Sequence, residues 1–251
     1  MKAYHNDPQL KATIRAETIA HREADRLARG FGYGRGEGDN FRGCAVGCAI
    51  HSLNLRAGSH HNVGDHRVYE TAYGVPVILA RLQDMIFENL THPEALAWPL
   101  QFWTAIPVGA DLSGVWNKFA HWLLIDPEFG VLRYANTDRI EKAIQSVADL
   151  YAKKIAGENV TCDEWGKARA AACAASCAAA AAYAAAYAAS YADSAASAAS
   201  AAAASASAAD AYAAADAYAA DARKKIRRAQ ADKLIALMSE APITAQTGGA
   251  K

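Results

Sequence analysis

The sequence predicts an all-α protein, in which a compact helical domain precedes a long Ala-rich helix or helical hairpin. Between positions 168 and 222 about two thirds of the residues are alanine, which has the highest intrinsic helix propensity. No glycine or proline falls between Gly166 and Pro242, so nothing in that stretch breaks a helix by itself. In the first 157 residues, apolar side chains recur every three or four positions, which indicates amphipathic helices.

The composition divides the chain into three parts. Residues 1–157 contain nearly all of the Trp, Phe, Ile and Leu, and among the tryptophans only Trp165 lies beyond them. We therefore expect residues 1–157 to form a globular domain that folds on its own. Residues 158–241 are expected to form the Ala-rich arm, and residues 242–251 a disordered tail.

The globular domain is expected to hold about six helices. Asp7 and Pro8 are suited to a helix start, as the N-cap and the first helical residue. Asp111 is expected to cap a later helix, which Asp126 and Pro127 end. Gly130 to Ala135 is the one short strand-like run. The helical patterns span residues 8–29, 66–73, 75–90, 93–106, 111–125 and 138–156.

The Ala-rich arm begins with a capping box, because Thr161 is followed three residues later by Glu164. Tyr183, Tyr187 and Tyr191 are four residues apart and would form one stripe along a helix. The serines between positions 194 and 207 favour a bend. An antiparallel hairpin that self-associates into a dimer or larger oligomer is therefore expected, and the alternative is a solvated, partly frayed spacer.

Charge and composition restrict the partners and the cellular location that we expect for the protein. Lys plus Arg equals Asp plus Glu at 26 each, so nucleic acid is not an expected partner. The basic run from Arg223 to Arg228 is better explained as charge near a helix C-terminus. The first residues carry no apolar signal region, and four aspartates interrupt the Ala-rich stretch, which argues against a membrane span. Five cysteines, an odd number, favour a reducing compartment such as the cytoplasm.

Glycine alternates with other residues from Gly30 to Gly38, and this run continues to Gly43. Such a segment forms a loop, and its backbone N–H groups with Arg35 and Arg42 would suit a phosphate. The spacing matches neither a P-loop nor a dinucleotide-binding fingerprint. Arg35 and Arg42 are therefore candidate ligand-binding residues, and a plain mobile loop is the alternative.

Three segments carry a resemblance to known sequences. Residues 1–7 (MKAYHND), 43–48 (GCAVGC) and 106–113 (IPVGADLS) resemble segments of uncharacterised proteins from phages and prophages. The likeness covers the N-terminal part and includes an Ala-rich tail of variable sequence. It implies a viral or mobile-element setting, in the cytoplasm of the host cell, and it transfers no catalytic residue.

The first chemical candidate is Cys44-x3-Cys48-x2-His51. On a helix these residues share one face, so two thiolates and an imidazole would suit Zn²⁺, with His60, His61 or His66 as a fourth ligand. Cys44 or Cys48 would also serve as a nucleophile if His66 activated it. The simpler interpretation is a buried, core-like segment, because cysteine is among the most buried residues.

The second candidate combines two pairs at helical spacing, His66 with Glu70 and Asp84 with Glu88. If the two helices packed antiparallel, the four side chains would suit Mg²⁺ or Mn²⁺ and the cleavage of a phosphate ester. The alternative is that Asp84 and Glu88 lie on the solvated side of an amphipathic helix.

These observations leave three classes of function open. The favoured class is a phage-type accessory protein that binds a host factor, a nucleotide or another small ligand through its N-terminal domain and self-associates through the arm. The second is a small hydrolase acting on a nucleotide or an ester, with a Cys/His or a metal-carboxylate site. The third is a structural spacer without a site. Residue types and spacing alone do not decide whether the protein is an enzyme.

Overall fold

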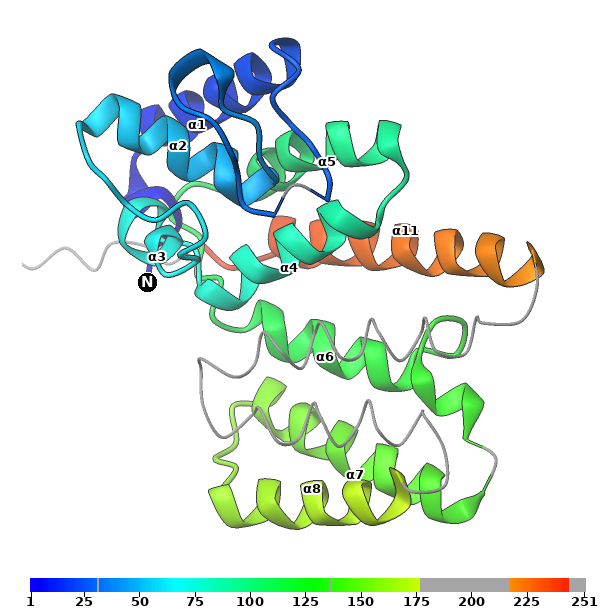
Figure 1. The fold of residues 1–251 in the computed structure, drawn as a ribbon. Helices are drawn as coiled ribbons and strands as arrows, with labels where there is room; N and C mark the ends of the chain where they lie inside the picture. The colour runs from blue at the N-terminus through cyan, green and yellow to red at the C-terminus, as the bar shows by residue number, and fades with distance from the viewer. Residues whose placement is uncertain (31, 136, 177–216, 244–251) are drawn as a thin grey trace, which may run out of the picture. The chain divides into compact units, whose positions relative to one another are not determined.

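A computed structural model describes residues 1–30, 32–135, 137–176 and 217–243 of the 251-residue chain (Figure 1). Within these ranges the chain forms nine α-helices and three short 3-10 helices, and its β-structure is limited to isolated bridges. The all-α class is therefore confirmed for the described residues. The predicted serine bend and tyrosine stripe of the Ala-rich arm lie outside them.

The chain divides into two compact units, which differ from the predicted domains. The first unit joins Met1–Ser113 to Leu234–Lys251, and the second is Gly114–Lys233. The boundary thus falls between Ser113 and Gly114 rather than at residue 157, and residues 234–243 belong with the beginning of the chain.

The first unit packs five α-helices of its own around one core, together with the end of α11. Helix α5 packs against α1 and α4, while α2 packs against both α1 and α4. The elements in chain order are η1 (Ala3–Asn6), α1 (Pro8–Glu23), η2 (Gly38–Asn40), α2 (Ala45–Ala57), α3 (Val68–Tyr73), α4 (Val77–Asn89) and α5 (His92–Ala105).

Local signals in the sequence set the ends of these helices. Asp7 caps α1 as predicted, since its Oδ1 accepts a hydrogen bond from the Gln9 N–H at 2.8 Å. Thr91 and Glu94 form a capping box at the start of α5. Gly58 and Gly74 end α2 and α3 in the left-handed conformation, which glycine adopts without strain.

Aromatic side chains dominate the core of the first unit. The rings of Tyr69 and Tyr73 each lie 5.1 Å from that of Trp103, and the Tyr4 hydroxyl donates to the Trp103 carbonyl at 2.6 Å. Large aromatic rings bury much apolar area and add favourable edge contacts. The fully buried aromatic side chains of this unit are Tyr4, Tyr69, Tyr73, Phe87, Trp98, Phe102 and Trp103.

The two ends of the described chain meet the same loop of the first unit. The Ala3 N–H donates to the Ala110 carbonyl at 2.9 Å, and the Asp111 N–H donates to the Pro242 carbonyl at 2.8 Å. Ile243 forms an isolated bridge with Ala110. Pro242 and Ile243 are therefore part of the fold, although both were expected in the disordered tail, and residues 244–251 lie outside the described chain.

The second unit consists of α6 (Val115–Ile125), η3 (Val131–Tyr134), α7 (Asp138–Ile155), α8 (Cys162–Ser176) and α11 (Ala217–Ser239) up to Lys233. Helix α7 packs against both α6 and α8. In its core, Tyr151 lies edge to face with Trp165 at 5.0 Å. The predicted capping box opens α8, because Thr161 and Glu164 each accept a hydrogen bond from the other's backbone N–H.

Two local predictions were wrong. The strand-like run from Gly130 to Ala135 contains the 3-10 helix η3, because a strand needs a neighbour to satisfy its backbone groups and the described residues provide no neighbouring strand. Asp111 was expected to cap a helix, but α6 is preceded by Gly114 instead. The Asp111 carboxylate accepts from the Ser113 N–H at 3.0 Å and so stabilises a turn.

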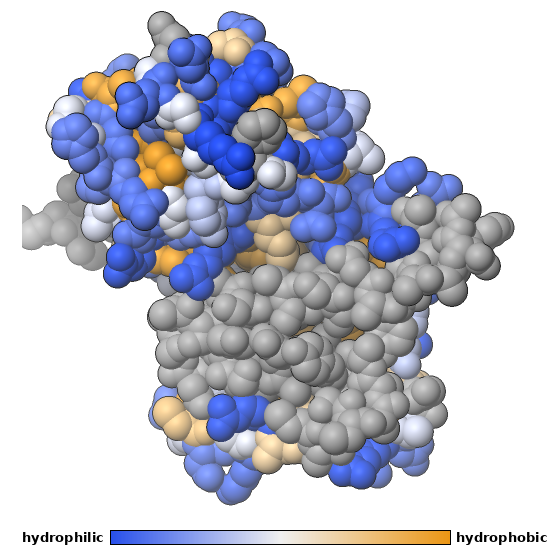
Figure 2. All heavy atoms as spheres, viewed as in Figure 1, coloured by the Kyte–Doolittle hydropathy of each residue, from blue (hydrophilic) through white to orange (hydrophobic). Residues whose placement is uncertain are grey.

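The surface of the described residues carries few exposed large apolar side chains. On the face in Figure 2, the hydrophobic residues that are coloured form small areas between hydrophilic ones. None of the helices in the described part of the chain is long and apolar enough to cross a membrane. The exposed large apolar residues are Met1, Tyr33, Leu55, Ile155 and Ile243.

Candidate functional site

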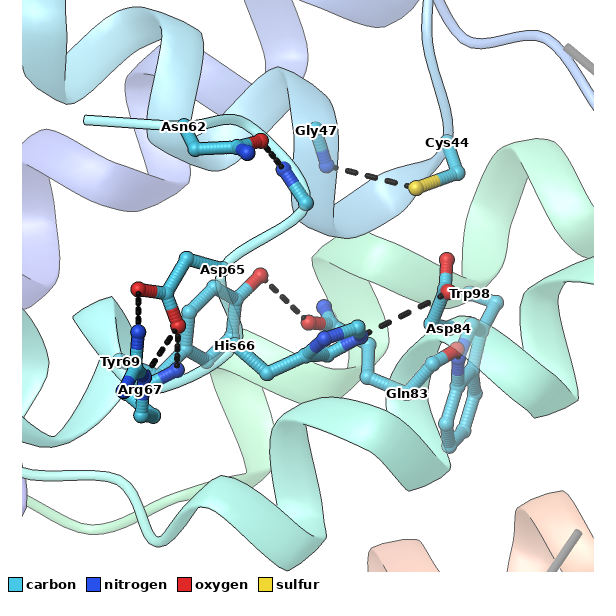
Figure 3. Close-up of polar contacts among 11 residues, drawn as sticks. Cys44, Gly47, Asn62, Asp65, His66, Arg67, Tyr69, Gln83, Asp84 and Trp98 are labelled. Carbon is cyan, nitrogen blue, oxygen red and sulfur yellow. Dashed lines mark hydrogen bonds and ion pairs between the residues drawn. The ribbon is translucent and has the colours of Figure 1, made fainter. Parts of the chain in front are cut away.

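Three chemically distinct side chains converge inside the first unit, and we call them the Cys44/His66/Asp84 cluster (Figure 3). Cys44 is the N-cap of α2, His66 lies in the turn before α3, and Asp84 lies on α4. His66 Nε2 is 3.7 Å from Asp84 Oδ2. The cluster therefore combines Cys44 of the first predicted site with Asp84 of the second, and His66 was a candidate in both.

Short-range hydrogen bonds hold the backbone that carries the cluster. The Gly47 N–H donates to Cys44 Sγ at 3.3 Å, which fixes the thiol at the start of α2. Asn62 Oδ1 accepts from the Gly64 N–H and Asp65 Oδ1 accepts from the Arg67 N–H, so two consecutive turns present His66.

Helix α4 is tied to α3 near its first turn. Glu70 Oε1 accepts a hydrogen bond from the Val77 N–H at 3.1 Å. Two groups of α3 and α5 then bind Gln83 on α4: the Tyr69 hydroxyl donates to its Oε1 at 2.8 Å, and Trp98 Nε1 donates to its carbonyl at 2.9 Å. These bonds set the rotation of α4 and so the position of Asp84.

Several buried polar atoms around the cluster lack a hydrogen-bond partner. They are Nε2 of His66, Oδ1 of Asp84 and Nε2 of Gln83. Gln83 is fully buried, and His66 is 8% exposed. A buried polar atom without a partner costs about 1–3 kcal/mol, so such atoms indicate either bound water or a binding site.

The thiol of Cys44 is held in its neutral form. Burial is the main cause that raises the pKa of Cys44, and the Asp84 carboxylate raises it further through its charge and through a hydrogen bond with the thiol. Its place at a helix N-terminus would act in the opposite direction, but burial and Asp84 outweigh that effect. Because the thiolate is the nucleophile of cysteine enzymes, this environment does not support the nucleophile hypothesis for Cys44.

Tyr33 of the Gly-rich loop covers the cluster on the solvent side. Its ring lies edge to face with that of His66 at 5.3 Å, and the residue is 43% exposed. This close approach requires glycine at two places. A Cβ atom at Gly64 would lie 2.5 Å from the Tyr33 ring, and one at Gly47 would lie 1.5 Å from the Tyr33 carbonyl oxygen.

The predicted zinc set does not come together. Cys48 Sγ donates to the Gly43 carbonyl at 3.5 Å, and burial raises the pKa of Cys48 to about 12. The His51 ring stacks on Phe41, with 4.0 Å between centroids and 3° between planes. Cys44 faces Asp84 instead, so the core-like interpretation of Cys48 and His51 agrees better with these contacts.

The predicted carboxylate set also separates. Glu70 accepts from the start of α4, and Glu88 Oε2 accepts from the Gly30 N–H at 2.8 Å. His66 and Asp84 are the pair that remains in contact. Across the described residues, no group of three or more His, Cys, Asp or Glu side chains is arranged to hold a metal ion.

The Gly-rich loop does not offer the predicted phosphate cradle at its arginines. The Arg35 and Arg42 N–H groups donate to each other's carbonyls at 2.8 and 2.9 Å, so these two amides are already bonded. The Arg42 guanidinium pairs with Asp25 at 2.9 Å on the surface. The loop is therefore held as a small bridged turn.

A second buried polar group lies between α1 and α2. His21 Nε2 is 2.7 Å from Ser52 Oγ, and the His21 ring lies 5.7 Å from that of His51. Burial, then His51 and Arg26, lower the pKa of His21 to about 4. The adjoining cavity is small and enclosed, so we interpret this group as part of the core.

Sequence reasoning missed Gln83 and Tyr33. Gln83 had a detectable signal, because it falls on the apolar face of α4 between Leu79 and Ile86, where a polar residue must find a buried partner. Tyr33 had no such signal in the sequence, since its contact with His66 arises from the path of a loop.

No family model, curated protein or solved structure matches this chain.

Proposed function

We propose that the protein is a non-catalytic, phage-type accessory protein of the host cytoplasm, which binds a small ligand through its N-terminal region and self-associates through the Ala-rich arm. The observation that carries the binding function is the Cys44/His66/Asp84 cluster, with two unpaired buried atoms beside a thiol kept neutral. A ligand would supply the missing partners and offset their desolvation.

The neutral thiol is the reason to prefer binding over catalysis. Covalent catalysis needs a thiolate within reach of a base, whereas burial and then Asp84 disfavour a negative charge on Cys44. A host protein is a second form of partner, and the likeness to phage proteins supports either form.

A thiol hydrolase acting on a nucleotide or an ester is the second candidate function. It is favoured by the convergence of Cys44, His66 and Asp84, which are the residue types of a nucleophile, a base and an orienting carboxylate. It requires a ligand or a loop movement that lowers the pKa of Cys44, and the described residues offer no group in that role.

The binding function is tested by what the purified protein retains. We expect mass spectrometry after heat release to find a small molecule in near-stoichiometric amount with the full-length chain, and to find it lost from a His66→Phe variant. Hydrolysis of nucleotides or of p-nitrophenyl acetate that disappears in Cys44→Ala would favour the hydrolase instead. A protein that retains nothing and hydrolyses nothing would contradict both.

The self-association function is carried by the sequence of the arm. Small residues allow close helix contacts. A stripe of tyrosines suits the edge of such a contact, because their rings can pack while their hydroxyls stay in solvent. We propose an antiparallel hairpin that pairs with a second copy. Light scattering at tens of micromolar should give a dimer or larger species for the full chain, and a smaller one after Tyr183, Tyr187 and Tyr191 are changed to alanine. A monomeric full-length chain would overturn this part.

A further inference from the structure

We propose that Asp84 and His66 bind a primary ammonium group of a small molecule, beneath the ring of Tyr33. This inference rests on the proposed binding function and specifies the class of ligand. It begins from the two unpaired atoms, Asp84 Oδ1 and His66 Nε2, both of which are buried.

The two atoms call for a hydrogen-bond donor. A carboxylate oxygen only accepts hydrogen bonds, and the imidazole Nε2 accepts in the tautomer that carries its proton on Nδ1. His66 Nε2 and Asp84 Oδ2 are 3.7 Å apart. The two side chains therefore lie close enough together for one donor group, at about 2.9 Å from each acceptor, to serve both of them. A primary ammonium group has three N–H donors and no acceptor, so it satisfies both residues at once.

The charge of the ligand follows from the carboxylate of Asp84. Cys44 is held neutral, so the cluster contains an acidic group without a thiolate. A buried carboxylate is stabilised by a positive partner that also donates hydrogen bonds. A metal ion would provide charge, but no three metal-ligating side chains are arranged around one point in the described chain. The hydrogen bonds of an ammonium group do not require three side chains arranged around one point.

Tyr33 provides both a cover and a third contact. The ring lies against His66, and Gly32 and Gly34 on either side of it have φ values of +64° and +159°. Gly64 lacks the Cβ atom that would push the ring away. The face of an aromatic ring attracts a cation within about 6 Å. Rotation of the loop at these glycines would admit the ligand, and closure would cover it.

The experiment uses the full-length chain with ethylamine hydrochloride as the probe. Ethanol is the neutral control, and tetramethylammonium chloride is the cation without N–H donors, all at matched chloride concentration. We expect ethylamine to shift the His66 imidazole NMR resonances in a saturable way, and the two controls to leave them unchanged.

Two variants on α4 form a matched pair. Asp84→Asn removes the proposed acceptor charge and should weaken ethylamine binding about tenfold or more. Glu88→Gln removes a carboxylate one turn away and should change the affinity less than about twofold, because the glutamine oxygen can still accept from the Gly30 N–H.

Tyr33→Ala, at a partly exposed position, should weaken ethylamine binding about threefold, as loss of a cation–π contact predicts.

Three results would overturn the inference. These are resonances that ethylamine does not move, equal shifts with tetramethylammonium or ethanol, and equal losses in Asp84→Asn and Glu88→Gln. If Asp84→Asn does not melt cooperatively, the Tyr33→Ala result and the two control ligands decide. A retained molecule without an amine would reject the ammonium site while the proposed binding function stands.

Discussion

Cys44 is a residue at which two physical effects oppose each other. A helix N-terminus stabilises a thiolate, whereas burial and a neighbouring carboxylate destabilise it. With Cys44 only 1% exposed, burial prevails and the pKa rises. The same argument applies to Cys48, whose pKa burial raises to about 12.

The first prediction concerns the reactivity of these thiols. In native protein at pH 8, iodoacetamide should label the exposed Cys162, while Cys44 and Cys48 react on the order of a hundredfold more slowly because they are buried and protonated. Peptide mapping by mass spectrometry measures all three sites together. Labelling in urea is the control, since all three should then react. Native labelling of Cys44 as fast as that of Cys162 would refute the neutral-thiol description.

The second prediction concerns His21. Its pKa is about 4 in the folded state against about 6.5 in an unfolded chain, so the unfolded state binds more protons between these values. The free energy of unfolding should therefore fall as the pH drops from 6.5 towards 4, by up to about 3 kcal/mol from His21. Urea unfolding at pH 7 and pH 4.5 measures the change. A His21→Gln variant should show a shallower dependence, and an unchanged one would assign the effect to other groups.

At the scale of elements, caps determine where the helices begin. Asp7 bonds to the Gln9 N–H, which is one of the free donors at the start of α1. Elements without such a signal were less predictable, as η3 and the start of α6 illustrate.

The third prediction tests the Asp7 cap. Asp7→Ala should lower the free energy of unfolding by about 1 kcal/mol, because the first turn of α1 loses its acceptor. Asp7→Asn is the matched control and should cost much less, since asparagine caps equally well. Chemical denaturation monitored by circular dichroism distinguishes the two. Equal losses in both variants would point to the charge rather than the cap.

At the scale of the whole molecule, the first unit is completed by the end of the chain. Leu234 and Met238 are fully buried on α11, and Pro242 accepts from Asp111. The prediction that residues 1–157 fold alone conflicts with this arrangement, because truncation there would expose part of the core.

The fourth prediction follows from that arrangement. Met238→Ala should destabilise the protein by about 2–5 kcal/mol, through lost burial and a cavity. Glu240→Ala, at an exposed position of the same segment, should change stability by less than about 0.5 kcal/mol. Thermal unfolding of both variants and of a chain ending at Gly157 provides the comparison. A Gly157 truncation that melts like the full chain would show that α11 is dispensable.

The sequence by itself determined the helical class, the Asp7 cap, the Thr161–Glu164 capping box and the small, apolar character of the segment from Cys44 to Ile50. These features depend on propensity, capping and periodicity, which act within about one helical turn. Among the candidate site residues, the sequence identified Cys44, His66 and Asp84, and it grouped His66 with Cys44 in one hypothesis and with Asp84 in another.

Only the tertiary structure decided which of them meet. Spacing grouped Cys44 with Cys48, and Asp84 with Glu88. The packing of α2, α3 and α4 instead brings Cys44 and Asp84 to His66. Glu88 and Cys48 have other partners, the Gly30 N–H and the Gly43 carbonyl. Spacing along one helix reports which side chains share a face, but the neighbour of that face depends on how separate helices pack and rotate. The same reason explains Tyr33 and the end of α11, whose contacts join residues far apart in the chain.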